Sequence, residues 1–344
     1  MPKIYPPEHV ERHAQMLGNR VKKRYEHLAK RFAREQIDCF RLYDWDIPEI
    51  RAVVDWYAGH LVVSEYERLQ TGPDWLPRMA RAVGEAMNVP PEKVFTKKRR
   101  TRTADGERYS AVGSGEWDHE AESRPTNDFR AAAEIAPRPD VRFPVRERDL
   151  KLWVNLGDFL DTGLYSDHRN TRQLVRGLAP GSDFLNLFAY TGAFTLAAAA
   201  GGAKTTTTVD RNATYTDWAR ENLALSGLSG PQHRLVQYDV EEFLDRTARE
   251  KTRYNLAVID PPSFFTDRTK GTAFDISLDH PRLLEKVLKV MVTGGIVFFS
   301  TNHQRFEPAM EGLRVSSNTE LTPGTIPDDY RNRQVHRCWK LVAL

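Results

Sequence analysis

The segment "DFLNLFAYTGAFTLAAAAGGAKTTTTVD", residues Asp183–Asp210, holds a strand, a turn, a helix and a second strand in sequence. The apolar run at its start predicts a buried strand, and the alanine-rich run after Gly192 predicts a helix. The β-branched run "TTTTVD" predicts a second strand that ends on Asp210. A strand, a helix and a strand joined by short connections form the repeating unit of a parallel sheet.

The same alternation continues towards the C-terminus. Strand-like runs lie at "HRLVQYD", "NLAVID" and "GGIVFFST", and helical runs lie between them at "TYTDWARENLAL", "EEFLDRTARE" and "HPRLLEKVLKVM". We therefore predict a doubly wound α/β domain over residues 156–344. Ligands of such sheets bind at the carboxyl ends of the strands, so the residues that directly follow each strand are the candidates for function.

Residues 37–155 predict a smaller α+β domain. "DCFRLYD" is typical of a strand, "VVDWYAGHLVVSEY" of a hairpin that turns at Gly59-His60, and "PRMARAVGEAMNV" of a helix. Another strand is expected at Lys93–Thr96, and "FPVRERDLKLWVN" predicts two short strands around a polar turn. Between Ser110 and Val141 all periodicity is lost, so a long loop is predicted over residues 110–141.

Positive charge gathers in the N-terminal part of a chain whose net charge is only +3. Residues 1–36 predict a basic helix, in which Val21, Tyr25, Leu28 and Phe32 form an apolar stripe opposite a cationic face. A second basic cluster follows in "KVFTKKRRTR". A single charged face is often only solvated, but two clusters favour an anionic polymer such as RNA. The candidate RNA contacts are Arg20, Lys22, Lys23, Arg24, Lys97, Lys98, Arg99 and Arg100.

The composition narrows the class of protein. The 344 residues are 40% hydrophobic and 28% charged, which is ordinary for a globular chain. No apolar run reaches the roughly 18 residues of a membrane helix and no signal peptide opens the chain, so we expect a cytoplasmic protein. Two cysteines are too few for a four-thiolate zinc site, and neither H-E-x-x-H nor C-x-x-C occurs, so no metal is expected.

The first predicted strand ends in "NLFAYTGAF", which carries Asn186, Phe188, Tyr190, Thr191 and Gly192. With one glycine and no G-x-G-x-x-G, this turn does not suit the pyrophosphate of a dinucleotide. The second strand ends on an acid, at the spacing where a carboxylate accepts hydrogen bonds from both hydroxyls of a ribose. The alternative is that Asp210 only caps the helix that follows it.

The third and fourth strands also end in acids. Asp239 with Val240 predicts an acceptor for an adenine amino group and an apolar cover for its ring, unless Asp239 is a helix cap. The fourth strand runs into Asp260-Pro261-Pro262. Together these strand ends fit a nucleoside cofactor without phosphates, for which S-adenosylmethionine is the best match.

The chain resembles a known family at these motifs and at "AFDISLDH", "RNRQVHRCW", "NRVKKRYEHLAKRFAREQIDCFRLYDWDIPE" and "LWVNLGDFLDTGLYSDHR". It is similar from Leu17 to Leu344 to the C-terminal half of the bacterial bifunctional 23S rRNA guanine methyltransferases. The resemblance implies a seven-stranded, Rossmann-like class I methyltransferase sheet, S-adenosylmethionine as cofactor, and 23S rRNA or a large-subunit precursor as partner. It also implies 7-methylguanosine as product, although rRNA cytosine-5 methyltransferases share the style of "DPPSF".

Carried over residue by residue, the resemblance places the cofactor contacts on the strand ends and on "DHR" before the first strand. Arg169, in that segment, is a candidate for the cofactor carboxylate, with a surface arginine as the alternative. The implied cofactor contacts are Arg169, Asn186, Phe188, Tyr190, Thr191, Gly192, Asp210, Arg211, Asp239, Val240 and Asp260.

The stretch "NLAVIDPPSFFTDR", residues Asn255–Arg268, bears on which atom is methylated. Carbon 5 of a pyrimidine requires attack by a cysteine thiolate, but Ser263 follows the prolines and Cys338 is expected to be buried in a C-terminal strand. An exocyclic amino group is usually held by an acid and a proline carbonyl followed by an aromatic residue, and here Phe264 stands one position late. Guanine N7 carries a free lone pair and needs no general base.

We therefore assign the catalytic roles to Asp260, Pro261 and Phe264. The acid is expected to accept from the guanine N1 and amino edge or to balance the charge of the product, while Phe264 or Phe265 stacks on the base and the other packs. Cytosine-5 or exocyclic-amino methylation, a silent cofactor-binding RNA module, and an oxidoreductase with an atypical nucleotide loop stay open as alternatives.

Overall fold

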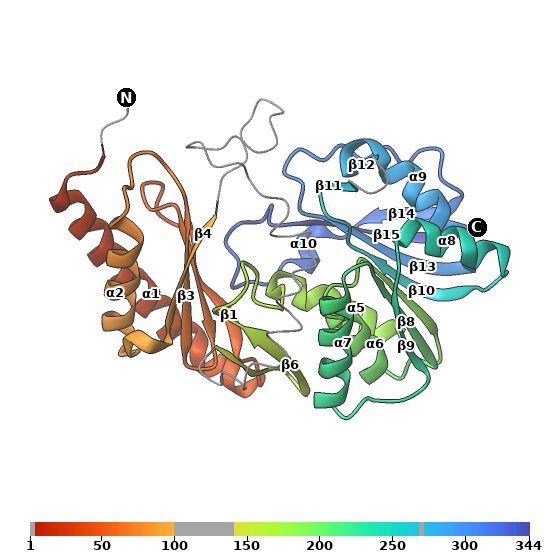
Figure 1. Cartoon of the computed structure of the whole chain (residues 1–344), viewed down its shortest axis with the longest axis horizontal. Helices are drawn as coiled ribbons and strands as arrows, with labels where there is room; N and C mark the ends of the chain where they lie inside the picture. The colour runs from red at the N-terminus through yellow and green to blue at the C-terminus, as the bar shows by residue number, and fades with distance from the viewer. Residues whose placement is uncertain (1–3, 100–140, 268–271) are drawn as a thin grey trace. The chain divides into compact units, whose positions relative to one another are not determined.

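The structure is a computed structural model, and it describes residues 4–99, 141–267 and 272–344 (Figure 1). The chain divides into two compact units. The first comprises Met1–Asp149 with Val154–Thr162, and the second comprises Leu150–Trp153 with Gly163–Leu344. The chain passes between the units at 149/150, 153/154 and 162/163, and the expected boundary at 155/156 stays a prediction. The predicted loop at residues 110–141 lies almost wholly outside the described residues.

The first unit is an α+β structure with one four-stranded sheet. Its order is β1-β2-β3-β4, with antiparallel neighbours except for the parallel pair β3 and β4. The elements are α1 (Pro7–Arg34), β1 (Cys39–Asp44), β2 (Ala52–Tyr57), β3 (His60–Tyr66), α2 (Trp75–Met87), the 3₁₀ helix η1 (Pro91–Lys93), β4 (Val94–Arg99) and β5 (Arg142–Glu147).

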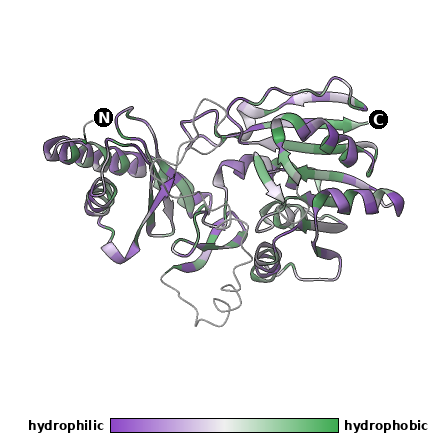
Figure 2. Cartoon of the chain, turned by 45° about the horizontal axis from the view of Figure 1, so that its top comes forward, coloured by the Kyte–Doolittle hydropathy of each residue, from purple (hydrophilic) through white to green (hydrophobic). Residues whose placement is uncertain are grey.

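The sequence pattern of the first unit explains its core. Val21, Leu28 and Phe32 of the predicted stripe are buried, and Tyr25 packs against them from a partly buried position. The strand, the hairpin and the helix predicted over residues 38–89 are confirmed, with boundaries that shift by one or two residues. In Figure 2 the helix beside the N-terminus is coloured mostly as hydrophilic residues.

The second unit contains the larger sheet. Strand β6 (Leu150–Asn155) is shared between the two units. The other elements are η2 (Ser166–His168), α5 (Arg169–Leu178), β7 (Asp183–Leu187), α6 (Ala193–Ala200), β8 (Thr205–Asp210), α7 (Ala213–Leu225), β9 (His233–Gln237), α8 (Val240–Arg249), β10 (Tyr254–Ile259), β11 (Phe264–Asp267), β12 (Thr272–Asp275), α9 (Ile276–Leu288), β13 (Met291–Thr301), β14 (Val315–Glu320), α10 (Thr322–Thr325) and β15 (Arg337–Ala343).

The larger sheet confirms the predicted α/β class. It has seven strands in the order β14-β15-β13-β10-β7-β8-β9. The strands from β13 to β9 are parallel, and β15 runs antiparallel to both of its neighbours. The chain moves outward from β7 to β9 and returns to the other side of β7 as β10, so the strand order reverses between β7 and β10. A ligand crevice is expected at the carboxyl ends of these two strands.

Side chains of alternate residues along the central strands pack into two separate cores. Phe184 and Val258 lie with residues of α5 and α6, whereas Leu185 and Ile259 lie with residues of α8 and α9. Alternation of this kind covers both faces of a parallel sheet with helices. Figure 2 shows hydrophobic residues concentrated along these strands.

Some elements were not predicted. The hairpin of β11 and β12, the edge strand β14 and the helix α5 carry mixed polar and apolar residues. All the residues of β14 after its first are exposed, so no apolar periodicity marks it. Of the described residues, no helix is both long enough and apolar enough to cross a membrane.

Asn222 of α7 supplies a test of how the second unit is held together. It is fully buried, its Oδ1 accepts from the Trp153 N–H at 2.8 Å, and its Nδ2 donates to the Thr191 carbonyl at 2.8 Å. The Asn222→Ala variant takes these partners from the buried Thr191 carbonyl and the half-buried Trp153 N–H, so the free energy of unfolding should fall by about 2–4 kcal/mol in urea denaturation. The Arg220→Ala control on the same helix removes only an exposed ion pair and should change it by less than about 0.5 kcal/mol. Equal losses would contradict this role.

Candidate functional site

The loop after β7 has an unusual backbone. Phe188 (φ 53°), Tyr190 (φ 50°) and Gly192 (φ 75°) are all left-handed. This conformation is uncommon for bulky residues, and such strain gathers at functional sites. A side chain at Gly192 would place its Cβ 2.7 Å from the Ala219 Cβ, so both the backbone and the close approach of α7 require glycine there.

Hydrogen bonds fix this loop in place. The Tyr190 N–H donates to Asp210 Oδ2 at 2.9 Å, and the Tyr190 hydroxyl accepts from the Gly163 N–H at 3.0 Å. Thr191 Oγ1 donates to the Gly163 carbonyl at 2.7 Å. The ring of Tyr190 meets the ring of Tyr215 edge-on, with centroids 4.6 Å apart. The loop is thereby tied to the end of β8 and to the segment before η2.

Asp210 is held as an acceptor and not as a helix cap. Its Oδ1 accepts from the Asn212 N–H at 2.9 Å, while Asn212 itself caps α7 by accepting from the Thr214 N–H. The alternative that Asp210 caps this helix is therefore wrong. Burial raises the pKa of the Asp210 carboxyl to about 6, against the opposing effect of the two N–H donors.

Asp239 does cap the next helix. Its side chain accepts from the Glu242 N–H at 3.1 Å at the start of α8. Val240 is buried in the core with residues of α8 and α9, so its side chain is not exposed to cover an adenine ring. The cap does not test whether Asp239 also accepts from an adenine, which stays a prediction.

Two other expected cofactor contacts are engaged within the protein. The Asn186 side chain is buried and donates to Thr195 Oγ1 at 3.0 Å. Arg169 is not a surface arginine: it is buried and forms a two-point ion pair with Asp329, with nitrogen–oxygen distances of 3.0 and 3.3 Å. A role for either residue at the cofactor stays a prediction.

The Asp-Pro-Pro turn after β10 is braced by the neighbouring strand β13. Ser300 Oγ donates to Asp260 Oδ1 at 2.6 Å. Three residues after Asp260, Ser263 Oγ donates to Asn302 Oδ1, just beyond the end of β13, at 2.7 Å. Pro261 is buried and Pro262 is exposed, and Asp260 keeps 29% of its side chain exposed. The acid is thus fixed in direction while it still reaches solvent.

The two phenylalanines after the turn lie in β11 and differ in their contacts. Phe265 stacks on Phe274 of β12, with ring centroids 5.2 Å apart, and the Arg211 guanidinium lies 4.9 Å over its ring. This is the packing expected of one of the two phenylalanines. Phe264 is half-buried, and its stacking on a base stays a prediction.

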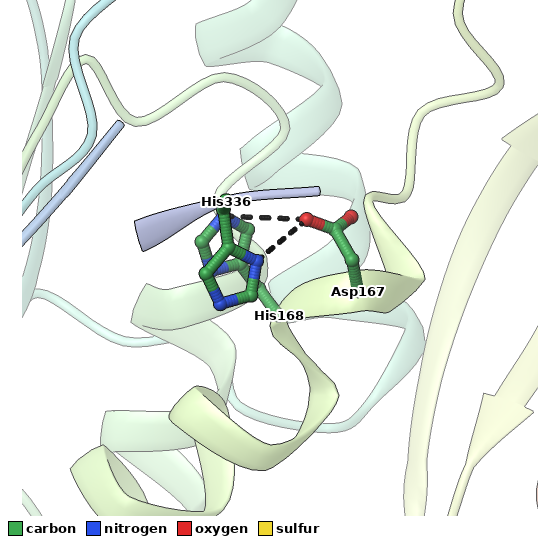
Figure 3. Close-up of side chains that lie close together, drawn as sticks. All are labelled: Asp167, His168 and His336. Atoms are coloured by element: carbon green, nitrogen blue, oxygen red, sulfur yellow. Dashed lines mark hydrogen bonds and ion pairs between the residues drawn. The ribbon is translucent and has the colours of Figure 1, made fainter. Parts of the chain in front are cut away.

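A cluster of buried polar groups behind Asp260 was missed by the sequence reasoning. His168 Nε2 lies 3.5 Å from Asp260 Oδ2 and 3.7 Å from Asp167 Oδ2. His336 Nδ1 bonds to the same Asp167 oxygen at 2.9 Å, and the two imidazoles stack 4.2 Å apart (Figure 3). In the sequence, the "DHR" segment indicated a site here, but the residue predicted from it was Arg169 and not His168.

The expected RNA contacts differ in their surroundings. Lys22 and Lys23 are exposed on α1, whereas Arg20 pairs with Asp46. The structure corrects the expectation for Lys97, which is buried and donates to the Phe159 carbonyl. Burial lowers the pKa of its ammonium to about 8. Lys98 lies 3.9 Å from Glu67, Arg99 lies 3.1 Å from Asp161, Arg24 is half-buried, and Arg100 lies outside the described residues.

Both cysteines are buried. Cys338 lies in β15 as expected, opposite Ser300 in the strand register. Burial raises the pKa of its thiol far above the usual range, so it is held as a thiol inside the core.

Comparisons with known proteins agree with the fold. A family model for "S-adenosylmethionine-dependent methyltransferase" matches residues 123–314. "Ribosomal RNA large subunit methyltransferase K" of Neisseria meningitidis is 35% identical over 94% of this chain and 86% of its own length. "Ribosomal RNA large subunit methyltransferase K/L" of Allochromatium vinosum is 36% identical over 98% of this chain and 44% of its own length. The chain thus spans less than half of that relative, and correspondence with its C-terminal half in particular stays a prediction.

Solved structures share the architecture. A methyltransferase crystallised with SAH superposes with a TM-score of 0.70 at 22% identity, over 97% of this chain and 82% of that one. A SAM-dependent methyltransferase from Streptococcus mutans superposes with a TM-score of 0.69 at 22% identity, over 100% of this chain and 83% of that one. Because the family model covers more than half of the chain and the Neisseria relative matches along most of both lengths, the chain belongs to the S-adenosylmethionine-dependent methyltransferase family.

Proposed function

We propose that this chain methylates guanine N7 in the RNA of the large ribosomal subunit. The RNA class follows the names of the relatives, which are ribosomal RNA large subunit methyltransferases. The observation that carries the choice of atom is the acid of the Asp-Pro-Pro turn, braced by Ser300 and still open to solvent, with no exposed thiol among the described residues. This arrangement would orient a base, and it offers no exposed nucleophile for attack on carbon 5.

The cofactor side of the site fits a nucleoside. S-adenosylmethionine supplies a methyl group activated on a sulfonium. Asp210 is half-buried at the end of β8, and two backbone N–H donors leave its carboxylate further lone pairs, which suit the two ribose hydroxyls. We propose Asp239, at the end of the neighbouring strand β9, as the acceptor for the adenine amino group.

Methylation at N7 requires that the base be oriented, but it does not require removal of a proton from the base. Asp260 would accept from guanine N1–H and from the amino group, which turns the N7 edge of the same base towards the donor methyl. Phe264 would stack on the base, and the Pro261 carbonyl offers a second acceptor at the turn. Since methylation at N7 makes the ring cationic, a fixed carboxylate also stabilises the charge that develops in the transition state.

One observation supports a second candidate function, methylation of cytosine carbon 5. Cys338 lies in β15 opposite Ser300 of β13, the strand between β15 and β10, so a thiol is near the acid even though it is buried. Methylation of cytosine carbon 5 would require that thiol to be uncovered and ionised, and its raised pKa opposes this.

The Asp260→Ala variant tests the proposal. It should lower methyl transfer to rRNA by about a hundredfold or more, while S-adenosylhomocysteine binding changes by less than about threefold, because the ribose acid is untouched. Transfer is measured with labelled cofactor, and mass spectrometry of the digested rRNA reads 7-methylguanosine against 5-methylcytidine. Asp217→Asn, an exposed acid on α7, is the matched control and should retain full activity. Full activity of Asp260→Ala would remove this acid from the mechanism, and binding without transfer by the unaltered protein would favour the silent module.

Asp210 predicts a pH dependence of cofactor binding. Because its pKa is about 6 in the folded protein, the carboxylate needed for the ribose hydroxyls is lost as the pH falls below 6, and affinity for S-adenosylhomocysteine should drop by up to about tenfold per pH unit there. Its effect on folding has the opposite sign. An acid whose pKa is raised on folding binds more protons in the folded state, so its contribution to stability decreases as the pH rises from about 4 to 6.

Calorimetry from pH 5 to pH 7.5, beside melting curves in the same buffers, separates the two effects. The Asp210→Asn variant should bind weakly at every pH. An unchanged affinity of the unaltered protein across this range would contradict the assignment of Asp210 to the ribose.

The exposed lysines of α1 predict a salt dependence. The Lys22→Ala/Lys23→Ala double variant should bind an rRNA fragment more weakly and should reduce the slope of log affinity against log salt by about 1.5, since each phosphate contact contributes about 0.7–0.9. Lys204→Ala changes an exposed lysine at the amino end of β8, away from the strand ends that form the site, and should leave the slope unchanged. Equal slopes for both variants would mean that the α1 lysines are only solvated.

A further inference from the structure

The carboxylate of Asp260 has a donor on one side and an imidazole on the other. Ser300 Oγ donates to Oδ1 at 2.6 Å, and His168 Nε2 faces Oδ2 at 3.5 Å. His168 lies in η2, more than ninety residues before the acid in sequence, and it is buried, whereas Asp260 reaches solvent. A buried imidazole thus lies directly behind the acid that the proposed reaction uses to hold the base.

The surroundings of His168 fix which nitrogen carries its proton. Nε2 faces two carboxylate oxygens, from Asp260 and from Asp167 at 3.7 Å, while Nδ1 is buried without a hydrogen-bond partner among the described residues. A neutral imidazole has one N–H, and the proton belongs on the nitrogen that faces acceptors. A charged imidazolium would bury a second N–H with no acceptor. Burial and the neighbouring His336 lower the pKa of His168, in agreement with the neutral form.

Two aromatic rings contact the ring of His168. His336 stacks on one face at 4.2 Å and 11°, and Phe194 meets it edge-on at 5.6 Å. His336 is fixed in turn, because Nδ1 bonds to Asp167 Oδ2 at 2.9 Å and Nε2 bonds to Thr325 Oγ1 at 3.0 Å. Four charged or titratable groups face His168: Asp260 at the end of β10, Asp167 next to His168 in the chain, His336 before β15, and Arg172 of α5.

We propose that His168 is a positioning residue for methyl transfer, which holds Asp260 Oδ2 through Nε2–H while Ser300 holds Oδ1. The two donors together stop rotation of the carboxylate, so both oxygens present their remaining lone pairs towards the base. This proposal rests on the proposed role of Asp260 towards the substrate. In this proposal the hydrogen-bonded pair of Asp167 and His336 holds the ring of His168, which faces Asp260.

A metal site is the competing interpretation of the same atoms. One ligand atom from each of Asp167, His168 and His336 lies within 4.8 Å of the others. Ring-nitrogen lone pairs lie in the plane of the imidazole, so two rings stacked nearly parallel do not aim them at one point between the rings. His336 Nδ1 also lies at hydrogen-bond distance from the Asp167 oxygen, which the proton on that nitrogen explains. For Asp167 and His336 the geometry therefore favours a hydrogen bond over a shared metal ion.

Two variants separate the hydrogen bond from the packing. His168→Phe keeps a ring between Phe194 and His336 and removes the donor, whereas His168→Gln keeps an N–H donor near the position of Nε2. His168→Phe should lower kcat for transfer to rRNA by about tenfold to a hundredfold, with the affinity for S-adenosylhomocysteine within about threefold of the unaltered protein. His168→Gln should retain kcat within about fivefold. Equal losses in both variants, or no loss in His168→Phe, would overturn the proposal.

A measurement that needs no activity distinguishes this proposal from the proposed function. Nitrogen NMR of protein labelled at histidine should show His168 as the neutral Nε2–H tautomer, assigned by the signal absent from His168→Gln and shifted in Asp260→Asn. The Nδ1–H tautomer would overturn the proposal. If the unaltered protein shows the Nε2–H signal but transfers no methyl group to rRNA, the proposed function is overturned instead. If elemental analysis finds one metal ion per chain, and if both His168 variants lose it, the metal site is the correct interpretation and the hydrogen bond is not.

Discussion

The hydrogen bond from the Tyr190 N–H to the Asp210 carboxylate joins the ends of two neighbouring strands, and the site depends on it. It forms because the loop after β7 turns left-handed at Phe188 and Tyr190, which carries the amide towards β8. The same loop is anchored through Thr191 to Gly163, so the segment before η2 is fixed by the conformation of the first strand end. A single strained turn thereby sets the position of Asp210, the acid proposed to bind the ribose, and, through η2, of the groups behind Asp260.

Much of the fold of the second unit was predictable because its signals are local. A strand can be recognised within about six residues, so the strands that precede Asp210, Asp239 and Asp260 were predicted from sequence, and the roles of these three acids stay predictions. What decided their surroundings was not local. Only the structure showed that Asn212, and not Asp210, caps α7, since both offer an acceptor within three residues of the helix.

The missed features depend on partners far apart in the chain. His168 and His336 stack across 168 positions, and no periodicity links them. Lys97 sits in a run of basic residues that favours a charged surface, yet the alternation of the strand turns this one side chain inward. The hairpin of β11 and β12 has too few apolar residues to be recognised before its pairing is known.

The segment before β15 is joined to the segment around η2 by three buried polar pairs, which are Ser166 with Tyr330, Asp167 with His336, and Arg169 with Asp329. Each pair connects residues separated by at least 160 positions. Such contacts close long loops and form late when a chain folds. On a ribosome, the strand ends at Asp210 and Asp239 would therefore be synthesised before Ser300, which braces Asp260, and before His336, which stacks on His168. Competence to bind the methyl donor would precede competence to use it.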